Sequence, residues 1–241
     1  MTEEGKATPP ADSDRDAAVI FDIFMRIAAI PRCSGNEDGI VRFILDRAAA
    51  AGFMAEKDTA GNVYITRPGE GGGEVAPPVV LQAHMDMVCV AAPGCDHDFA
   101  REGIDCYEED GILRARGTSL GADNGIGLAI GLHLMEHPGK SHPPIQLIAT
   151  REEETTMHGA ASLDPPACIA GTTVINLDDE EEGVITTSSA GMMAVAFAFS
   201  APPRPVRGPV SWQTVEVVGG RGVAIRGGWR RRPVGPMPSP F

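Results

Sequence analysis

The chain has 241 residues, of which 43% are hydrophobic, and its formal net charge is −13 at pH 7. It is long enough to bury a substantial core, and its acidic balance argues against nucleic acid or anionic membranes as partners, because both are bound through clustered Lys and Arg. No apolar run reaches the ~20 residues of a membrane span, and the polar N-terminus lacks the pattern of a signal peptide. We therefore expect a cytoplasmic protein.

The first fifty-odd residues show helical spacing of apolar side chains, followed by two short strand patterns around a turn of hairpin length. Five segments are expected: a disordered N-terminus over 1–13, a helix over about 14–30 capped by Ser13, a helix over about 36–50 capped by Asn36, and hairpin strands over 53–57 and 62–66.

The stretch from Val79 to Asp86 (VVLQAHMD) turns from an apolar run into His84-Met85-Asp86. This pattern indicates a buried strand that delivers two ligand-type side chains to one edge of a sheet. Side chains alternate along a strand, so His84 and Asp86 should point the same way. A metal-binding imidazole needs a fixed orientation, which Asp86 is well placed to provide. A histidine at a strand end is more often structural, so the assignment depends on partners from other strand ends.

Acidic residues follow the later strand patterns at the same topographic position. A strand over 145–150 ends in Glu152-Glu153-Glu154, and a strand over 173–177 ends in Asp178. Asp123 lies in a Gly-rich loop, for which a simple turn with a capping Asp is by itself the better explanation, and most acidic runs are solvated faces. The remaining expected elements are a strand over 112–116, a helix over about 126–135, a short helix over 158–163, and strands over 184–188 and 192–199.

Together these positions supply one imidazole and four carboxylates: His84, Asp123, Glu153, Glu154 and Asp178. The carboxyl ends of parallel strands meet at one edge of a sheet, so an α/β fold would bring them together. Such donors suit zinc, manganese or cobalt, and a bridging carboxylate is the usual way to hold two ions that activate water. Side chains of neighbouring residues diverge, so one glutamate can bind metal while the other stays free as a general base.

The motifs LQAHMDMV, HDF, ARGTSLGADNGIGLA, TREEETTMHGA and INLDDEEEG, in this order and spacing, closely resemble the aminoacyl-histidine dipeptidases. That family, also called Xaa-His dipeptidases, peptidase D or cytosol non-specific dipeptidases, belongs to the di-zinc aminopeptidase and carboxypeptidase superfamily. The resemblance runs from about residue 15 to about 220. It implies a three-layer α/β catalytic domain with a mostly parallel central sheet and a metal-dependent hydrolase of Xaa-His and other dipeptides.

The resemblance also implies a role for each site residue. His84 and Asp178 would bind the first metal, Asp86 would orient His84, Asp123 would bridge both metals, Glu154 would bind the second metal, and Glu153 would be the general base that takes a proton from the attacking water. Two zinc ions are implied, with manganese or cobalt as substitutes. The peptide bond between Asp123 and Asn124 is expected to be cis, as in the superfamily.

The chain departs from the family at its C-terminal end. Family members are about twice as long, with an inserted lid and dimerisation domain and a last metal-binding histidine. Here residues 201–241 hold seven arginines against the single Glu216, and the family pattern ends near Gly222. We expect 14–200 to be the N-terminal part of the catalytic domain and 201–241 to be the start of the lid segment running into a disordered tail, as in a truncated or frameshifted product.

Truncation would leave the second metal site incomplete, impair activity and make the family's lid-mediated homodimer unlikely. Three functions therefore stay open: a metal-dependent dipeptidase, a related di-zinc aminopeptidase or N-acyl amino acid deacylase, and a non-catalytic remnant that binds one metal. The five cysteines are an odd number without a Cys-x-x-Cys motif, so we expect reduced thiols and assign no role to any of them.

Overall fold

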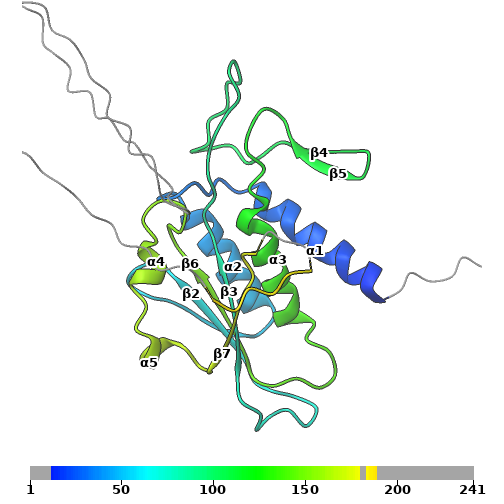
Figure 1. Ribbon diagram of the computed structural model, residues 1–241, viewed down its shortest axis with the longest axis vertical. Helices are drawn as coiled ribbons and strands as arrows, with labels where there is room; N and C mark the ends of the chain where they lie inside the picture. Colours follow the sequence, from blue (N-terminus) through cyan, green and yellow to red (C-terminus); the bar gives the residue numbers. More distant parts are fainter. Residues whose placement is uncertain (1–11, 180–182, 189–241) are drawn as a thin grey trace, which may run out of the picture. The chain divides into compact units, whose positions relative to one another are not determined.

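The computed structural model describes residues 12–179 and 183–188 (Figure 1). The chain combines short strands with three longer helices. The elements are α1 (Asp12–Ala28), α2 (Asp38–Ala50), β1 (Met54–Lys57), β2 (Val63–Arg67), β3 (Val79–His84), β4 (Cys106–Glu109), β5 (Ile112–Ala115), α3 (Ala122–Glu136), β6 (Ile145–Thr150), α4 (His158–Ala161), α5 (Pro165–Cys168) and β7 (Thr173–Asn176).

A five-stranded sheet with the order β1-β2-β6-β3-β7 forms the middle layer. Strand β3 pairs in parallel with both β6 and β7, whereas the β1–β2 hairpin joins the sheet through antiparallel pairing of β2 with β6. The three parallel strands therefore end at the same edge. His84, the last residue of β3, pairs with Thr150, the last residue of β6, so the segments that follow these two strands begin side by side.

The two faces of the sheet are covered by different parts of the chain, because side chains alternate along each strand. On β3, Leu81 and Ala83 join the main core with α1, α2 and α3, whereas Val80 points to the other face. There Val80 packs near Tyr64 and Ile148 against Ile169, which directly follows α5. The expected three-layer α/β fold with parallel strands at its centre is confirmed, and the hairpin makes the sheet mixed.

Helix α3 packs closely on the sheet because its inward face carries glycine. A Cβ atom on Gly131 would come within 2.7 Å of Leu147 Cδ1 on β6, which is closer than real Cβ contacts allow. The helix is apolar around most of its circumference, as expected for one buried between the sheet and α1. This close approach places the N-terminal end of α3 beside the end of β3.

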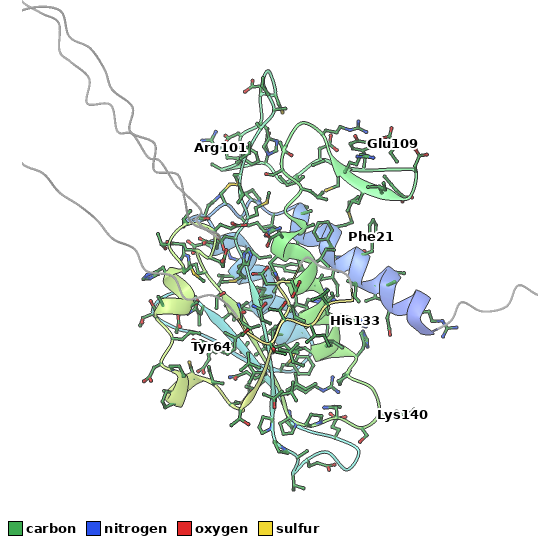
Figure 2. All side chains as sticks on the ribbon, viewed as in Figure 1. Phe21, Tyr64, Arg101, Glu109, His133 and Lys140 are labelled. Carbon is green, nitrogen blue, oxygen red and sulfur yellow. A yellow bond between two sulfur atoms is a disulfide. The ribbon has the colours of Figure 1, made fainter. Side chains whose placement is uncertain are left out.

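Residues 85–121 leave the sheet after β3 and return at the start of α3. They form a long loop and the β4–β5 hairpin, which extend beyond the His84 end of β3 (Figure 1). Arg101 and Glu109 lie on these two excursions (Figure 2). Within the described residues, no helix combines the length and the apolar character needed to cross a membrane.

Several predicted details are wrong. Helix α1 begins at Asp12, so Ser13 lies inside it, and α2 is preceded by Glu37, which makes no side-chain cap, instead of by Asn36. Residues 184–188 form no strand. Strand β4 was not predicted, because CYEE lacks apolar alternation. The rest of the expected disordered N-terminus, the expected strand over 192–199 and the tail over 201–241 lie outside the described residues.

Candidate metal centre

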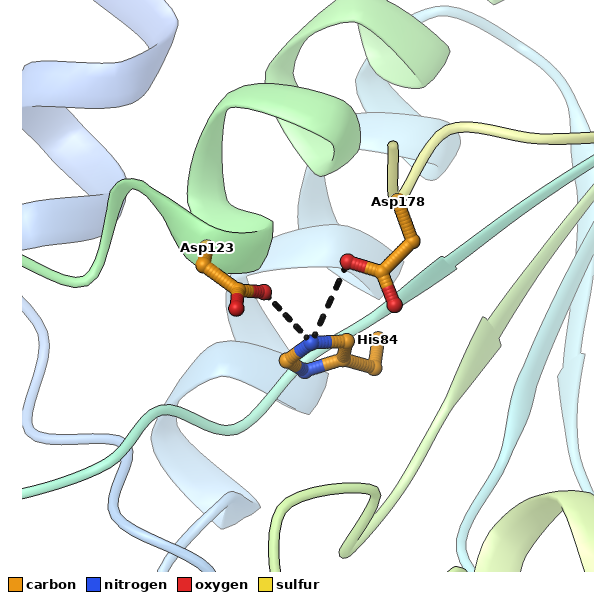
Figure 3. Close-up of side chains that lie close together, drawn as sticks. All are labelled: His84, Asp123 and Asp178. Atoms are coloured by element: carbon orange, nitrogen blue, oxygen red, sulfur yellow. Dashed lines mark hydrogen bonds and ion pairs between the residues drawn. The ribbon is translucent and has the colours of Figure 1, made fainter. Parts of the chain in front are cut away.

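The predicted site residues come together at the shared end of the parallel strands, and Figure 3 shows three of them, His84, Asp123 and Asp178. His84 ends β3, and its ring is 1% exposed. Asp123 lies at the start of α3, the glutamate pair follows β6, and Asp178 follows β7. Four segments that are far apart in sequence therefore each contribute an imidazole or a carboxylate to one place.

The ring atom His84 Nε2 is the point on which these side chains converge. It lies 2.9 Å from Asp123 Oδ1, 3.6 Å from Asp178 Oδ1 and 3.9 Å from Glu153 Oε2. Two sets have ligand atoms within 4.8 Å of one another, namely His84 with Asp123 and Asp178, and His84 with Glu153 and Glu154. Both glutamates face the same place, so distance alone does not divide them into base and ligand.

Asp86 holds the other side of the His84 ring. Its Oδ1 atom lies 3.3 Å from His84 Nδ1, and its backbone oxygen lies 3.1 Å from the same nitrogen. Burial opposes the charge of the Asp86 carboxylate, but hydrogen bonds from His84, from the Ser34 hydroxyl and from the Glu153 amide lower its pKa to about 2. Asp86 is therefore a buried anion at neutral pH, and it favours a proton on His84 Nδ1. This contact orients the ring so that the opposite nitrogen, Nε2, faces the other carboxylates.

The charge balance of the cluster suits a cation. Burial raises the pKa of Glu154, and the nearby charge of Asp123 raises it further. Burial also raises the pKa of Asp178. For His84, burial opposes the charged ring, but the hydrogen bond with Asp86 and the charges of Asp178 and Asp86 outweigh it and raise the pKa to about 9. Crowded carboxylates around one imidazole are the donor set expected for zinc or a similar divalent ion, so the residues fit such a group.

The local backbone aims Asp123 and Asp178 at His84. The peptide bond between Asp123 and Asn124 is cis, as expected, and neither residue has helical dihedral angles, so regular helix begins about where it was predicted. The Asn124 side-chain amide donates to Leu177 O over 2.9 Å and to Asp178 Oδ1. Asn124 thereby ties the start of α3 to the segment that follows β7.

A buried arginine that the sequence did not single out lies beneath the centre. Arg32 Nη1 donates to Met85 O over 3.0 Å and to Asp86 O over 2.9 Å, and Nη2 donates to Gly121 O. Burial lowers the pKa of Arg32 to about 10, although Asp86 and other carboxylates oppose this effect. Its three acceptors belong to the loops of His84 and Asp123, so Arg32 fixes these loops relative to each other. Nothing in the motif Pro-Arg-Cys pointed to this role.

The expectation that all cysteines are reduced is wrong. Cys33 and Cys89 form a disulfide with a Cα–Cα distance of 5.8 Å, whereas Cys95, Cys106 and Cys168 are free. The bond joins the segment between α1 and α2 to the segment after Asp86. A backbone bond from Met87 N to Arg32 O over 3.1 Å already holds the two segments together, which brings the cysteines within reach. Their 56-residue separation follows no motif that sequence reading could use.

Comparisons with known proteins identify the family of the chain. Residues 80–210 match the model of peptidase family M20/M25/M40. The chain is 40% identical over 144 residues to the cytosol non-specific dipeptidase of Escherichia coli strain K12, which covers 60% of this chain and 30% of that protein.

Solved structures show the same relationship. Aminoacylhistidine dipeptidase from Vibrio alginolyticus matches with a TM-score of 0.66 and 38% identity over 69% of this chain and 34% of that one. Aminopeptidase PepT from Bacillus cereus shares the fold, with a TM-score of 0.57 and 24% identity over 68% of this chain and 44% of that one. The chain thus spans about a third of the length of the two dipeptidases.

Proposed function

Because the chain belongs to peptidase family M20/M25/M40, we propose that its metal centre serves the hydrolysis of dipeptides, Xaa-His dipeptides among them. The observation that carries the proposal is the convergence of Asp123, Asp178 and Glu153 on His84 Nε2, while Asp86 holds Nδ1. The names of the two dipeptidase relatives support the substrate class. The name of the cytosol dipeptidase relative supports a cytoplasmic location.

The donor set supports zinc as the ion, with manganese or cobalt as substitutes. His84, Asp123 and Asp178 would hold one ion, and Glu154 would hold a second, shared through Asp123. The described residues thus supply three donors to the first position and two to the second. Divalent ions bound there would polarise the scissile carbonyl and make a nearby water more acidic.

Glu153 is the proposed general base. Its side chain is 30% exposed, so its carboxylate can reach both the cluster and an entering substrate. It takes a proton from the attacking water and passes that proton to the amine that leaves when the peptide bond breaks. Asp86 keeps the proton of His84 on Nδ1, so that the lone pair of Nε2 is free to bind an ion at the centre. Asp86 also accepts hydrogen bonds from the backbone amides of Glu153 and Glu154, which fixes the base beside His84.

Metal titration and turnover assays of the purified chain test the proposal. We expect zinc, manganese or cobalt to bind the first position and to support only impaired hydrolysis of Xaa-His dipeptides, because the second position has two donors. Glu153→Gln should retain metal while the remaining turnover falls by about 10²–10⁴-fold, the usual contribution of a general base. N-acyl amino acids are assayed in parallel. Turnover of these substrates alone would replace the proposal by a deacylase, and metal binding without any turnover would favour a non-catalytic metal-binding protein.

A further inference from the structure

Four consecutive backbone amides around the glutamate pair each donate a hydrogen bond to a side-chain oxygen. In chain order, the amides of residues 151–154 meet Asn62 Oδ1 at 3.1 Å, Glu37 Oε1 at 3.1 Å, Asp86 Oδ1 at 3.0 Å and Asp86 Oδ2 at 3.2 Å. Glu152 has a φ of 53°, in the left-handed region that non-glycine residues seldom adopt. The surrounding acceptors therefore impose the shape of this segment.

Glu37 stands out among the acceptors because its carboxylate is fully buried, with 0% exposure, and belongs to neither proposed metal position. Its Oε1 atom accepts from the Glu152 amide, and its Oε2 atom accepts from Arg151 Nε over 2.9 Å. Both donors come from the two residues directly before Glu153. Glu37 thus fixes the two residues that precede the glutamate pair, through the backbone amide of Glu152 and through the side chain of Arg151.

The backbone of Glu37 is itself held in place. Its backbone oxygen accepts from Val41 N over 2.9 Å in the first turn of α2. That helix buries Ile40, Val41, Ile44 and Ala48 in the main core. The Glu37 side chain starts at the N-cap of this packed helix and ends in two hydrogen bonds, so it has little freedom to move. The position of the Glu152 amide is therefore set by α2, a helix that contributes no residue to the proposed metal positions.

We propose that Glu37 is a positioning residue that sets where Glu153 and Glu154 lie relative to His84. This role rests on the proposed function of the two glutamates. Asp86 holds their amides from the side of β3, and Glu37 holds the preceding amide from the side of α2. Removing Glu37 would leave the Glu152 amide and the Arg151 guanidinium without their acceptor, and the segment would relax away from His84. Displacements of about 1 Å are enough to weaken catalysis strongly.

The neighbouring Asp38 provides a matched control. It carries the same charge next to Glu37 in sequence, but its side chain is 79% exposed and its carboxylate lies 4.0 Å from Arg151 Nη1. Asp38→Asn removes one negative charge near Arg151 without removing an acceptor from the backbone. Glu37→Gln keeps an oxygen for the Glu152 amide but presents Arg151 with an amide donor. Glu37→Leu removes both acceptors.

The first experiment follows amide hydrogen exchange by NMR in the metal-free chain. We expect the amides of residues 152–154 to exchange at least about tenfold faster in Glu37→Gln, and faster still in Glu37→Leu, because local opening becomes easier. Amides in the middle of β6, such as that of Ile148, should keep their protection in Glu37→Gln, and Asp38→Asn should match the wild type throughout. Unchanged exchange at 152–154 in Glu37→Gln would overturn the proposal, and so would equal acceleration at Ile148, which would indicate general destabilisation.

The second experiment measures binding of zinc and of manganese to the same variants. We expect affinity to fall about 10–100-fold in Glu37→Gln, the usual effect of losing a partner that orients ligands, and to be unchanged in Asp38→Asn. Unchanged affinity in a folded Glu37→Gln chain would overturn the positioning role. If the wild type bound no metal, the proposed function would fail, whereas the exchange experiment would still decide whether Glu37 holds this segment.

Discussion

Breaking the Cys33–Cys89 disulfide should lower the thermal stability of the chain substantially. The bond closes a loop with a sequence separation of 56 residues. In the chain-entropy description, a loop of this size contributes about 4 kcal/mol at 25 °C, because the unfolded chain loses conformational freedom. For a domain of this size, about 1 kcal/mol changes Tm by roughly 2–4 °C, so we expect Cys33→Ser or a reducing agent to lower Tm by about 8–16 °C.

Scanning calorimetry of the metal-free chain, with and without a phosphine reductant, measures this change. Cys95→Ser is the matched control because Cys95 is a free, half-buried cysteine. Thiol titration under denaturing conditions should find three reactive thiols before reduction and five afterwards. Reduction should have no further effect on Cys33→Ser. Five reactive thiols in protein handled without reductant would show that the disulfide does not form, and an unchanged Tm after reduction would show that it does not stabilise the fold.

Three further predictions concern protons and close packing. Against the effect of burial, the neighbouring carboxylates raise the pKa of His84 to about 9, so zinc must displace a proton from the ring at pH 7. We expect about one proton to be released per zinc bound, and zinc affinity to rise about tenfold per pH unit up to about pH 9. Calorimetry in buffers of different ionisation enthalpy would detect the released proton. Burial alone would raise the pKa of Asp58, but hydrogen bonds from Tyr64 and Asn62 outweigh it and lower the pKa below 3.8. The ionised Asp58 therefore stabilises the folded state above that pH, and this contribution to the unfolding free energy is lost as the pH falls. Asp58→Asn should flatten the dependence of the unfolding free energy on acid pH. A Cβ on Gly159 would come within 2.4 Å of Arg151 N, so Gly159→Ala should cost about 1–3 kcal/mol in urea unfolding and weaken metal binding.

The parallel strands and the convergence of the candidate site residues were predictable because each depends on a local pattern. The apolar run over 145–150 and the abrupt change at His84 gave β6 its observed bounds and β3 its end. Parallel strands then bring their ends together whatever the details of packing. The resemblance to a known family added the cis bond and the roles of the individual carboxylates, which local patterns alone left open.

The supporting contacts were not predictable, because they join residues far apart in sequence through ordinary residue types. Arg32 meets acceptors 53, 54 and 89 residues away, and Glu37 meets donors 114 and 115 residues away. Judged from its sequence neighbours alone, an arginine before a cysteine predicts a solvated charge. The same is true of a glutamate at the start of a helix. Only the packing of the segment between α1 and α2 beneath the centre buries these charges and gives them partners. The disulfide escaped prediction for the same reason.

Anomalous diffraction at the zinc absorption edge, from crystals of the chain grown with zinc, would locate the bound metal directly. We expect a peak about 2.0–2.2 Å from His84 Nε2 and from carboxylate oxygens of Asp123 and Asp178. In crystals of His84→Ala the peak should be absent at equal zinc concentration. A peak bound by other residues, or no peak at the shared end of β3, β6 and β7, would show that these three residues do not form a zinc site.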